Sequence, residues 1–235
     1  ASSRVVEFCL RAGIILDDGY AISFKHDLFR KAIEESLSPH RQRELNQLVV
    51  EAMLKATSVE VPYTRIVHHA LQAGDVKRIQ QFAPLAAQDA AAVGSHREAA
   101  KFYKLGLEAS GDLSPETRVS LYEKYSHECY LTGQVKEAIN ALEATIPLLP
   151  KDDFIHHGNV YRLLSELYNE AGHFLKAESL GKQAIDYCEH FPSSRELALA
   201  YSHLSEMMLL GDQIQESLKL IEKAMEIANQ LNDPE

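Results

Sequence analysis

Histidines and cysteines are the side chains most able to do chemistry in this sequence of 235 residues, which holds eleven and three of them. The adjacent pairs His68–His69 and His156–His157 are the first candidates for a metal site. Adjacent residues on a helix point about 100° apart, so neither pair can face a single metal ion. Spacings of the types His-x-x-x-His and His-Glu-x-x-His do not occur. We therefore expect surface or interface histidines and no metal or other cofactor.

The three cysteines, Cys9, Cys129 and Cys188, are far apart and odd in number. Such spacing favours neither a disulfide framework nor a zinc knuckle, and it is typical of a reduced, cytoplasmic protein. Cys129 falls at a packing position of a predicted helix, where we expect a small, buried, unreactive side chain. These patterns predict no catalytic residue and no enzyme activity.

The charge balance limits the classes of partner. Thirty-four acidic and twenty-four basic residues give a formal net charge of −10, which would repel phosphate backbones and anionic membrane surfaces. The basic runs at 40–43 and 77–78 are short. No apolar run reaches the roughly 20 residues that span a bilayer, and the first residues do not form a secretion signal. We expect no nucleic acid and no membrane partner, and we interpret the chain as part of a longer protein.

Glycine marks an internal repeat. Gly94, Gly133, Gly172 and Gly211 recur every 39 residues, and each ends one helical pattern just before another begins. A fixed period in this range is typical of a solenoid. In the fourth unit the other repeat positions fall one residue later, so we expect Asp212 to take the conformation that glycine has in the others.

Small residues occupy three positions of each repeat. Paired helices approach closely only where side chains are small, so these positions predict the helix crossings. They are the anchors Ala99, Ala138, Ala177 and Ser217, the residues twelve earlier, Ala87, Ser126, Ser165 and Ser205, and the residues seven later, Gly106, Thr145, Ala184 and Ala224.

The repeat resembles the tetratricopeptide repeat, in which a helix A with small and bulky positions faces an alanine-led helix B. The resemblance implies an all-α protein, a right-handed superhelical solenoid of helix pairs. The period exceeds the usual 34 residues, so HEAT-like pairs remain an alternative, although the small positions favour the tetratricopeptide pattern. We expect helices at about 40–57, 62–73, 75–93 with a kink or break at Pro84, 95–110, 115–132, 134–149, 154–171, 173–190, 194–210 and 213–231, with caps at Ser95, Ser114 and Ser193.

The tetratricopeptide resemblance also implies a binding groove along the helix A wall. Projected onto this chain, the wall alternates amide, aromatic and charged side chains, which suits a peptide or small-ligand groove. A merely solvated wall is the alternative. The expected groove residues are Glu123, His127, Tyr130, Asn159, Arg162, Glu166, Asn169, Ser202 and Glu206.

Residues 1–38 do not fit the repeat. Two apolar runs flank Asp18-Gly19 and predict a β-hairpin, followed by a helix from about Lys25 to Leu37. The segment from Phe24 to Leu45, with His26, Leu28, Arg30 and Ser38-Pro39, is similar to the end of the winged-helix piece in large bacterial signal-transducing (STAND-type) ATPases, the group of LuxR-type and maltose-activator-like transcription regulators. No Gly-x-x-x-x-Gly-Lys-Ser/Thr loop occurs in the sequence, so nucleotide hydrolysis would belong to another part of such a protein.

This second resemblance implies three segments: residues 1–38 as the end of a winged-helix-like module with hairpin and helix, 39–93 as an atypical junction with a first helix pair, and 94–235 as tetratricopeptide-like repeats. It also implies a non-catalytic interaction or sensor module in signalling or transcription regulation. The expected partners are a protein or peptide, the chain's own upstream ATPase domain, or a small-molecule inducer. The alternative function is a scaffold or self-association module, which would form a homo-oligomer and bind no small ligand.

Overall fold

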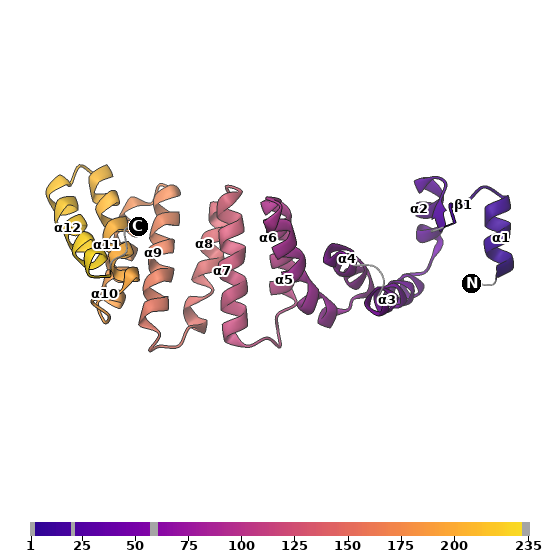
Figure 1. Ribbon diagram of the computed structural model, residues 1–235, viewed down its shortest axis with the longest axis horizontal. Helices are drawn as coiled ribbons and strands as arrows, with labels where there is room; N and C mark the ends of the chain where they lie inside the picture. Colours follow the sequence, from indigo (N-terminus) through magenta and orange to yellow (C-terminus); the bar gives the residue numbers. More distant parts are fainter. Residues whose placement is uncertain (1–2, 20–21, 57–60, 232–235) are drawn as a thin grey trace. The chain divides into compact units, whose positions relative to one another are not determined.

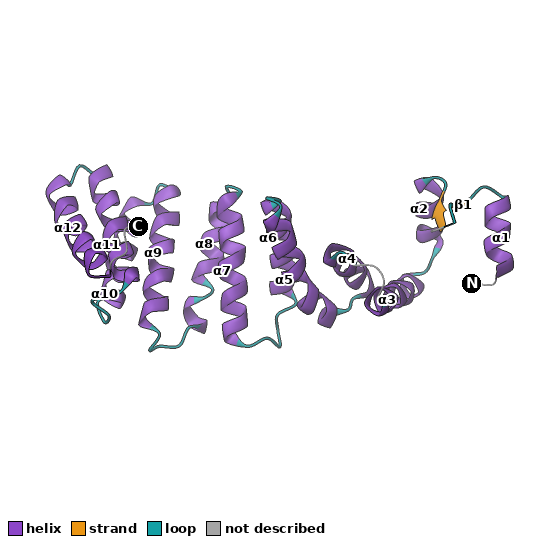
Figure 2. Cartoon of the chain, in the orientation of Figure 1, coloured by secondary structure: helices purple, strands orange, loops and turns teal. Residues whose placement is uncertain are grey.

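The computed structural model describes residues 3–19, 22–56 and 61–231, and most of them are helical (Figures 1 and 2). The chain divides into two compact units, residues 1–76 and 77–235. In chain order the elements are α1 (Ser3–Arg11), β1 (Ile15–Asp17), β2 (Ile22–Phe24), α2 (Asp27–Ser36), α3 (Pro39–Lys55), α4 (Tyr63–Ala73), α5 (Val76–Ala92), α6 (His96–Glu108), α7 (Pro115–Leu131), α8 (Val135–Glu143), the 3-10 helix η1 (Ile146–Leu148), α9 (Phe154–Glu170), α10 (Phe174–Cys188), α11 (Arg195–Leu210) and α12 (Ile214–Leu231).

The first unit contains the predicted hairpin and helix. Strands β1 and β2 pair antiparallel with Ile15 opposite Phe24. Gly19 has a left-handed φ of 85°, and its backbone N–H donates to the Asp17 carboxylate at 2.8 Å, as expected of an Asp-Gly turn. Residues 20 and 21 of this turn lie outside the described residues. The hairpin prediction is confirmed, whereas the preceding helix α1 was not predicted.

Helices α3 and α4 pack together in the same unit. Ser38 caps helix α3, because its hydroxyl accepts a hydrogen bond from the backbone N–H of Arg41, and Pro39 occupies the first turn. Val50 and Val67 are buried where the two helices meet. A hydrogen bond of 2.8 Å between His69 Nδ1 and Asn46 Oδ1 also links the two helices.

Four helix pairs, α5/α6, α7/α8, α9/α10 and α11/α12, form the second unit (Figure 1). The small positions lie at the helix crossings, as predicted. At three crossings the helix A serine donates a hydrogen bond of 2.7–2.9 Å to the carbonyl of the residue twelve later on helix B. In the first pair Ala87 replaces the serine and is fully buried. The pairs are Ser126 with Ala138, Ser165 with Ala177, and Ser205 with Ser217.

The turns between paired helices confirm the irregular fourth unit. Gly94, Gly133 and Gly172 have left-handed φ angles of 73–79°. In the fourth turn Gly211 has a φ of −89°, and Asp212 takes the left-handed conformation with a φ of 57°. This conformation strains a residue with a Cβ atom, and aspartate tolerates it better than most.

This difference gives a stability prediction. Asp212→Gly should stabilise the protein by about 0.5–1 kcal/mol because it relieves the left-handed strain. Gly133→Ala should destabilise it by about 1 kcal/mol for the opposite reason. Urea unfolding followed by circular dichroism measures both. If the two substitutions shifted the midpoint in the same direction, the assignment of Asp212 to the glycine position would be wrong.

Two expectations about helix continuity and ends can be compared with the structure. Of the kink or break expected at Pro84, the break does not occur, because helix α5 runs through this residue, and the proline ring packs beside Gly106 of α6. The helix expected over 134–149 ends at Glu143 and gives way to η1, since Pro147 lacks an N–H and would clash with the carbonyl four residues earlier.

The caps were partly predicted. Ser114 caps α7 by accepting from the backbone N–H of Thr117, as expected. The side chain of Ser95 makes no cap hydrogen bond at the start of α6. Helix α11 is capped by Ser194, which accepts from Leu197, and not by Ser193. Serines are adjacent at this helix start, and only the backbone conformation decides which one reaches the free N–H groups.

Candidate functional site

Five of the nine expected groove residues line one cavity between α7 and α9, with a volume of about 290 Å³. Its apolar wall is formed by Leu142 of α8 and by Leu163 and Leu167 of α9, and Ser126 completes the lining. The pairing of α7 with α8 and of α9 with α10 holds both helix A faces in place, since their serine crossings fix the two pairs. We call this cavity the Arg162 groove; its five expected residues are Glu123, His127, Tyr130, Arg162 and Glu166.

Arg162 is the one lysine or arginine among the described residues that line the groove. Its side chain is only 19% exposed. One guanidinium nitrogen, Nη2, donates to Asn159 Oδ1 at 3.0 Å, and the other, Nη1, lies 3.7 Å from Glu166 Oε2. Burial lowers the pKa of Arg162 and outweighs the opposite effect of Glu166. The buried cation is therefore only partly compensated, which favours an added anion.

The carboxylates of the groove have different partners. Glu166 accepts a hydrogen bond of 3.5 Å from the Tyr130 hydroxyl, and its charge raises the pKa of that tyrosine. The Glu123 carboxylate contacts His156 and not Arg162: its Oε1 lies 2.5 Å from His156 Nε2. The other ring nitrogen of His156 lies 3.4 Å from Asp153. His156 was not among the expected groove residues. Its position three residues after the helix cap Asp153 is a local signal for the contact with Asp153, whereas no local signal marks its contact with Glu123.

His203 is a second residue close to Arg162 that the sequence analysis did not single out. Its Nε2 lies 3.0 Å from the Ser165 hydroxyl oxygen. That hydroxyl donates to the Ala177 carbonyl at 2.7 Å, so the imidazole must be the donor to Ser165. Burial, with a further contribution from the positive charge of Arg162, lowers the pKa of His203 to about 4. The ring is therefore neutral at pH 7, and nothing in the repeat pattern marks this position.

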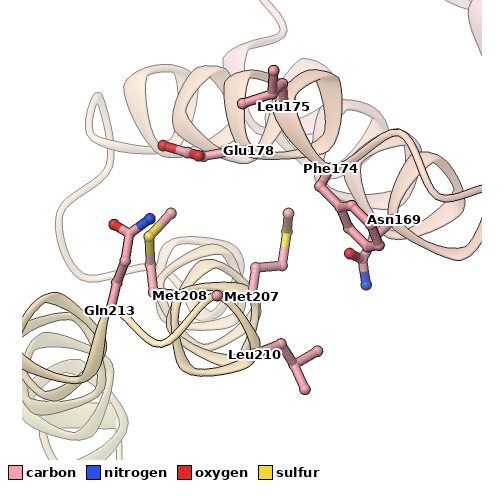
Figure 3. A pocket seen from close by; sticks show the side chains of 9 residues that line it. Asn169, Phe174, Leu175, Glu178, Met207, Met208, Leu210 and Gln213 are labelled. Carbon is pink, nitrogen blue, oxygen red and sulfur yellow. The ribbon is translucent and has the colours of Figure 1, made fainter.

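The remaining expected residues lie apart from the groove. Asn159 contacts it only through Arg162. Asn169 lines a different cavity, between α10 and α11 (Figure 3). Ser202 and Glu206 are exposed on α11 and are not among the residues lining the Arg162 groove. The structure thus gathers the three expected residues of α7 with Arg162 and Glu166 of α9, and it leaves two α9 asparagines and the α11 residues outside the groove.

The other chemical candidates keep structural partners. His157 Nε2 bonds to the Pro150 carbonyl at 3.1 Å, while His156 faces Glu123, so the pair diverges as expected. Cys129 is fully buried. Across residues 3–19, 22–56 and 61–231, no group of three or more His, Cys, Asp or Glu side chains could hold a metal ion. Within the same ranges, no helix is both long enough and apolar enough to cross a bilayer.

Comparison with known proteins identifies the fold. No protein-family model matches the chain, and no curated protein matches it in sequence. Solved structures with tetratricopeptide-like repeats do match it over most of its length. A putative kinesin light chain from Podosopora anserina with nearly identical tetratricopeptide-like repeats is 16% identical, with a TM-score of 0.56 over 85% of this chain and 92% of that chain.

Two further structures agree. YrrB, described as a tetratricopeptide protein with an unusual peptide-binding site, is 15% identical with a TM-score of 0.52 over 86% of this chain and 90% of that chain. MamA is 17% identical with a TM-score of 0.54 over 72% of this chain and 86% of that chain. At these identities the likeness establishes the fold, a tetratricopeptide-like solenoid, and it favours this pattern over the HEAT alternative.

Proposed function

We propose that this tetratricopeptide-like chain is a non-catalytic interaction and sensor module that binds an acidic group of a peptide or protein partner, or of a small effector, in the Arg162 groove. The observation that carries the proposal is the state of Arg162. Its guanidinium is largely buried and has its nearest carboxylate at 3.7 Å. An incoming carboxylate or phosphate could form two parallel hydrogen bonds with the planar guanidinium group. Leu163, Leu167 and Tyr130 would pack against the apolar part of the ligand.

The expected site can be tested through this arginine. Selection of a random peptide library on the immobilised chain should enrich peptides that carry carboxylates. Arg162→Ala should weaken the selected peptides by at least about thirtyfold, since truncating one partner of a buried charge pair costs about 2–5 kcal/mol. Isothermal titration measures the affinity. Arg162→Lys should bind with intermediate affinity, because lysine keeps the charge but loses the paired geometry.

Arg97→Ala is the matched control, because Arg97 is exposed on α6 and should leave the affinity unchanged. Circular dichroism should show unaltered helix content in all three variants. An unfolded Arg162→Ala variant would make Arg162 a structural residue. A folded variant with unchanged affinity would place the binding surface elsewhere.

The finer context that we propose is a sensor arm of a multidomain signalling ATPase or transcription regulator. The similarity of residues 24–45 to the junction of such proteins supports this context. The hairpin and the helices around it also expose several large apolar side chains, which suits a piece whose core is completed by another domain. These are Val5, Phe8, Leu16, Ile22, Leu28 and Ile33. Sequencing the complete gene tests this proposal. The proposed context is wrong if the gene encodes no nucleotide-binding module before residue 1.

A scaffold that self-associates is the second candidate function. Helix α12 exposes Ile214, Leu218 and Met225, which lie along one stripe at helical spacing. The equivalent residues of the second helix pair are Val135 and Ile139 of α8 and Ile146 of η1, and they pack in the core shared with α9. Light scattering at rising protein concentration separates the two functions. A dimer that forms without any ligand would favour the scaffold.

A further inference from the structure

A second cavity, separate from the Arg162 groove, opens between α10 and α11 (Figure 3) and has a volume of about 320 Å³. The side chains of Met207 and Met208 extend into it from α11, Phe174 closes one side, and Glu178 and Gln213 lie at the other. We call it the methionine pocket. Methionine side chains are flexible and polarizable, so they adapt to apolar groups of different shape.

The rim of the methionine pocket is unusually apolar. Phe174 is 65% exposed and Leu175 is 86% exposed at the start of α10, and Leu210 of α11 is 72% exposed. Contiguous exposed apolar groups of this kind mark interaction sites more often than single surface leucines do. Leu175 is among the residues that line the pocket, and its side chain lies on the side of α10 turned away from Met207 and Met208 (Figure 3).

The repeat itself shows that Leu175 is not needed for packing. The equivalent residues in the other three helix pairs are Arg97, Lys136 and Gln215, and all three are exposed. This position is apolar only in the pair α9/α10 and polar in the other three pairs. The packing that the pairs share therefore does not explain the leucine. The apolar residue stands only where it borders the methionine pocket.

Charge identifies the kind of partner. A neighbouring cavity of about 390 Å³ shares Glu178, Met208 and Gln213 with the methionine pocket. Its lining carries four carboxylates and two amines. Lys182 is already bound to Glu178 at 2.6 Å, and Lys219, outside the lining, lies 3.6 Å from Glu216. Glu189 accepts a hydrogen bond of 2.8 Å from the Tyr201 hydroxyl, and the Lys223 ammonium lies 5.0 Å from the centre of the Tyr201 ring. The surface beside the pocket is therefore net negative; its carboxylates are Glu178, Asp186, Glu189 and Glu216.

We propose that the methionine pocket binds a peptide segment of a partner protein that inserts a large apolar side chain between Met207 and Phe174 and places lysine or arginine side chains beside the carboxylates that line the neighbouring cavity. The apolar side chain would bury surface that is now wet, and the basic residues would meet the acidic lining of the neighbouring cavity. This segment differs in chemistry from the acidic ligand of the Arg162 groove. The two sites can therefore be tested separately.

The four methionines of the chain are built-in reporters for this proposal. Met207 and Met208 line the pocket, Met225 is exposed on α12 and Met53 lies in α3. The probe is a capped peptide of about ten residues with central leucines followed by lysines, a length that suits groove recognition. The chain carries ¹³C-methyl methionine. We expect the methyl signals of Met207 and Met208 to shift saturably and those of Met53 and Met225 to stay in place.

Matched peptides and variants sharpen the test. A peptide with glutamate in place of lysine should bind at least roughly tenfold more weakly, because like charges would then face each other. Leu175→Ser should reduce the affinity for the lysine peptide at least about fivefold, since it removes rim surface. Val93→Ser, at an 81% exposed position in the connection between α5 and α6, should leave it unchanged. Both serine variants should keep the wild-type melting temperature.

Several outcomes would overturn the proposal. One is the absence of shifts at Met207 and Met208 at millimolar peptide, or equal shifts at all four methionines. Another is unchanged affinity in Leu175→Ser, or equal binding of the glutamate peptide. Shifts of Met207 and Met208 on raising the protein concentration alone would show that a second copy fills the pocket in place of a partner peptide.

Discussion

Gly158→Ala is expected to destabilise the protein, although alanine is the better helix former. Gly158 lies inside α9, where the substitution alone should gain about 1 kcal/mol from helix propensity. A Cβ atom at this position would overlap Cys188 Sγ of α10 and lie 3.2 Å from the Ala184 carbonyl oxygen. Overpacking of a fitted helix contact costs about 1–3 kcal/mol. We expect a net loss of up to about 2 kcal/mol, measured by urea unfolding.

Two variants separate overpacking from a general effect of the substitution. Gly111→Ala should change stability by less than about 0.5 kcal/mol, because a Cβ atom there would meet nothing within 4 Å. In a Cys188→Ala background the clashing sulfur is absent, so Gly158→Ala should cost at least about 1 kcal/mol less than in the native chain. A neutral or stabilising Gly158→Ala would show that α9 and α10 can separate at no cost.

The stability of the protein should fall by about 3 kcal/mol between pH 7 and pH 4 because of His203. The pKa of this histidine is about 4 in the folded protein and about 6.5 in an unfolded chain. Above pH 6.5 the ring is neutral in both the folded and the unfolded protein, so it makes no pH-dependent contribution to the free energy of unfolding there. As the pH falls from about 6.5 to about 4, the unfolded chain binds the proton first and becomes favoured. The stabilisation is thus complete above pH 6.5 and lost by about pH 4.

His203→Gln isolates this contribution. Glutamine can still donate a hydrogen bond to Ser165, and it does not titrate. Between pH 7 and pH 4 the variant should lose about 3 kcal/mol less stability than the native chain. Urea unfolding at a series of pH values measures the difference. Parallel pH curves for the two proteins would mean that His203 is protonated in the folded protein without penalty.

The helix A wall shows how far sequence and structure agree on the candidate site. The projection placed Arg162 and Glu166 together, since residues four apart share a helix face. It could not place Glu123 beside His156, because that contact joins two repeat units. The same limit applies to Gly158, whose need for glycine comes from a cysteine thirty residues away in α10. Contacts between units depend on side chains that the repeat does not share.

By itself, the sequence determined the repeat. The 39-residue glycine period, the small crossing positions and the displaced Asp212 are local or periodic features, and helix geometry converts them directly into turns and crossings. Only the tertiary structure decided which polar residues share a cavity and that the methionine pocket lies beside an acidic lining. It also set the neutral state of His203, because burial and the nearby Arg162 charge fix that pKa. Burial and electrostatics depend on everything that surrounds a group in space, and no spacing along the chain encodes that surrounding.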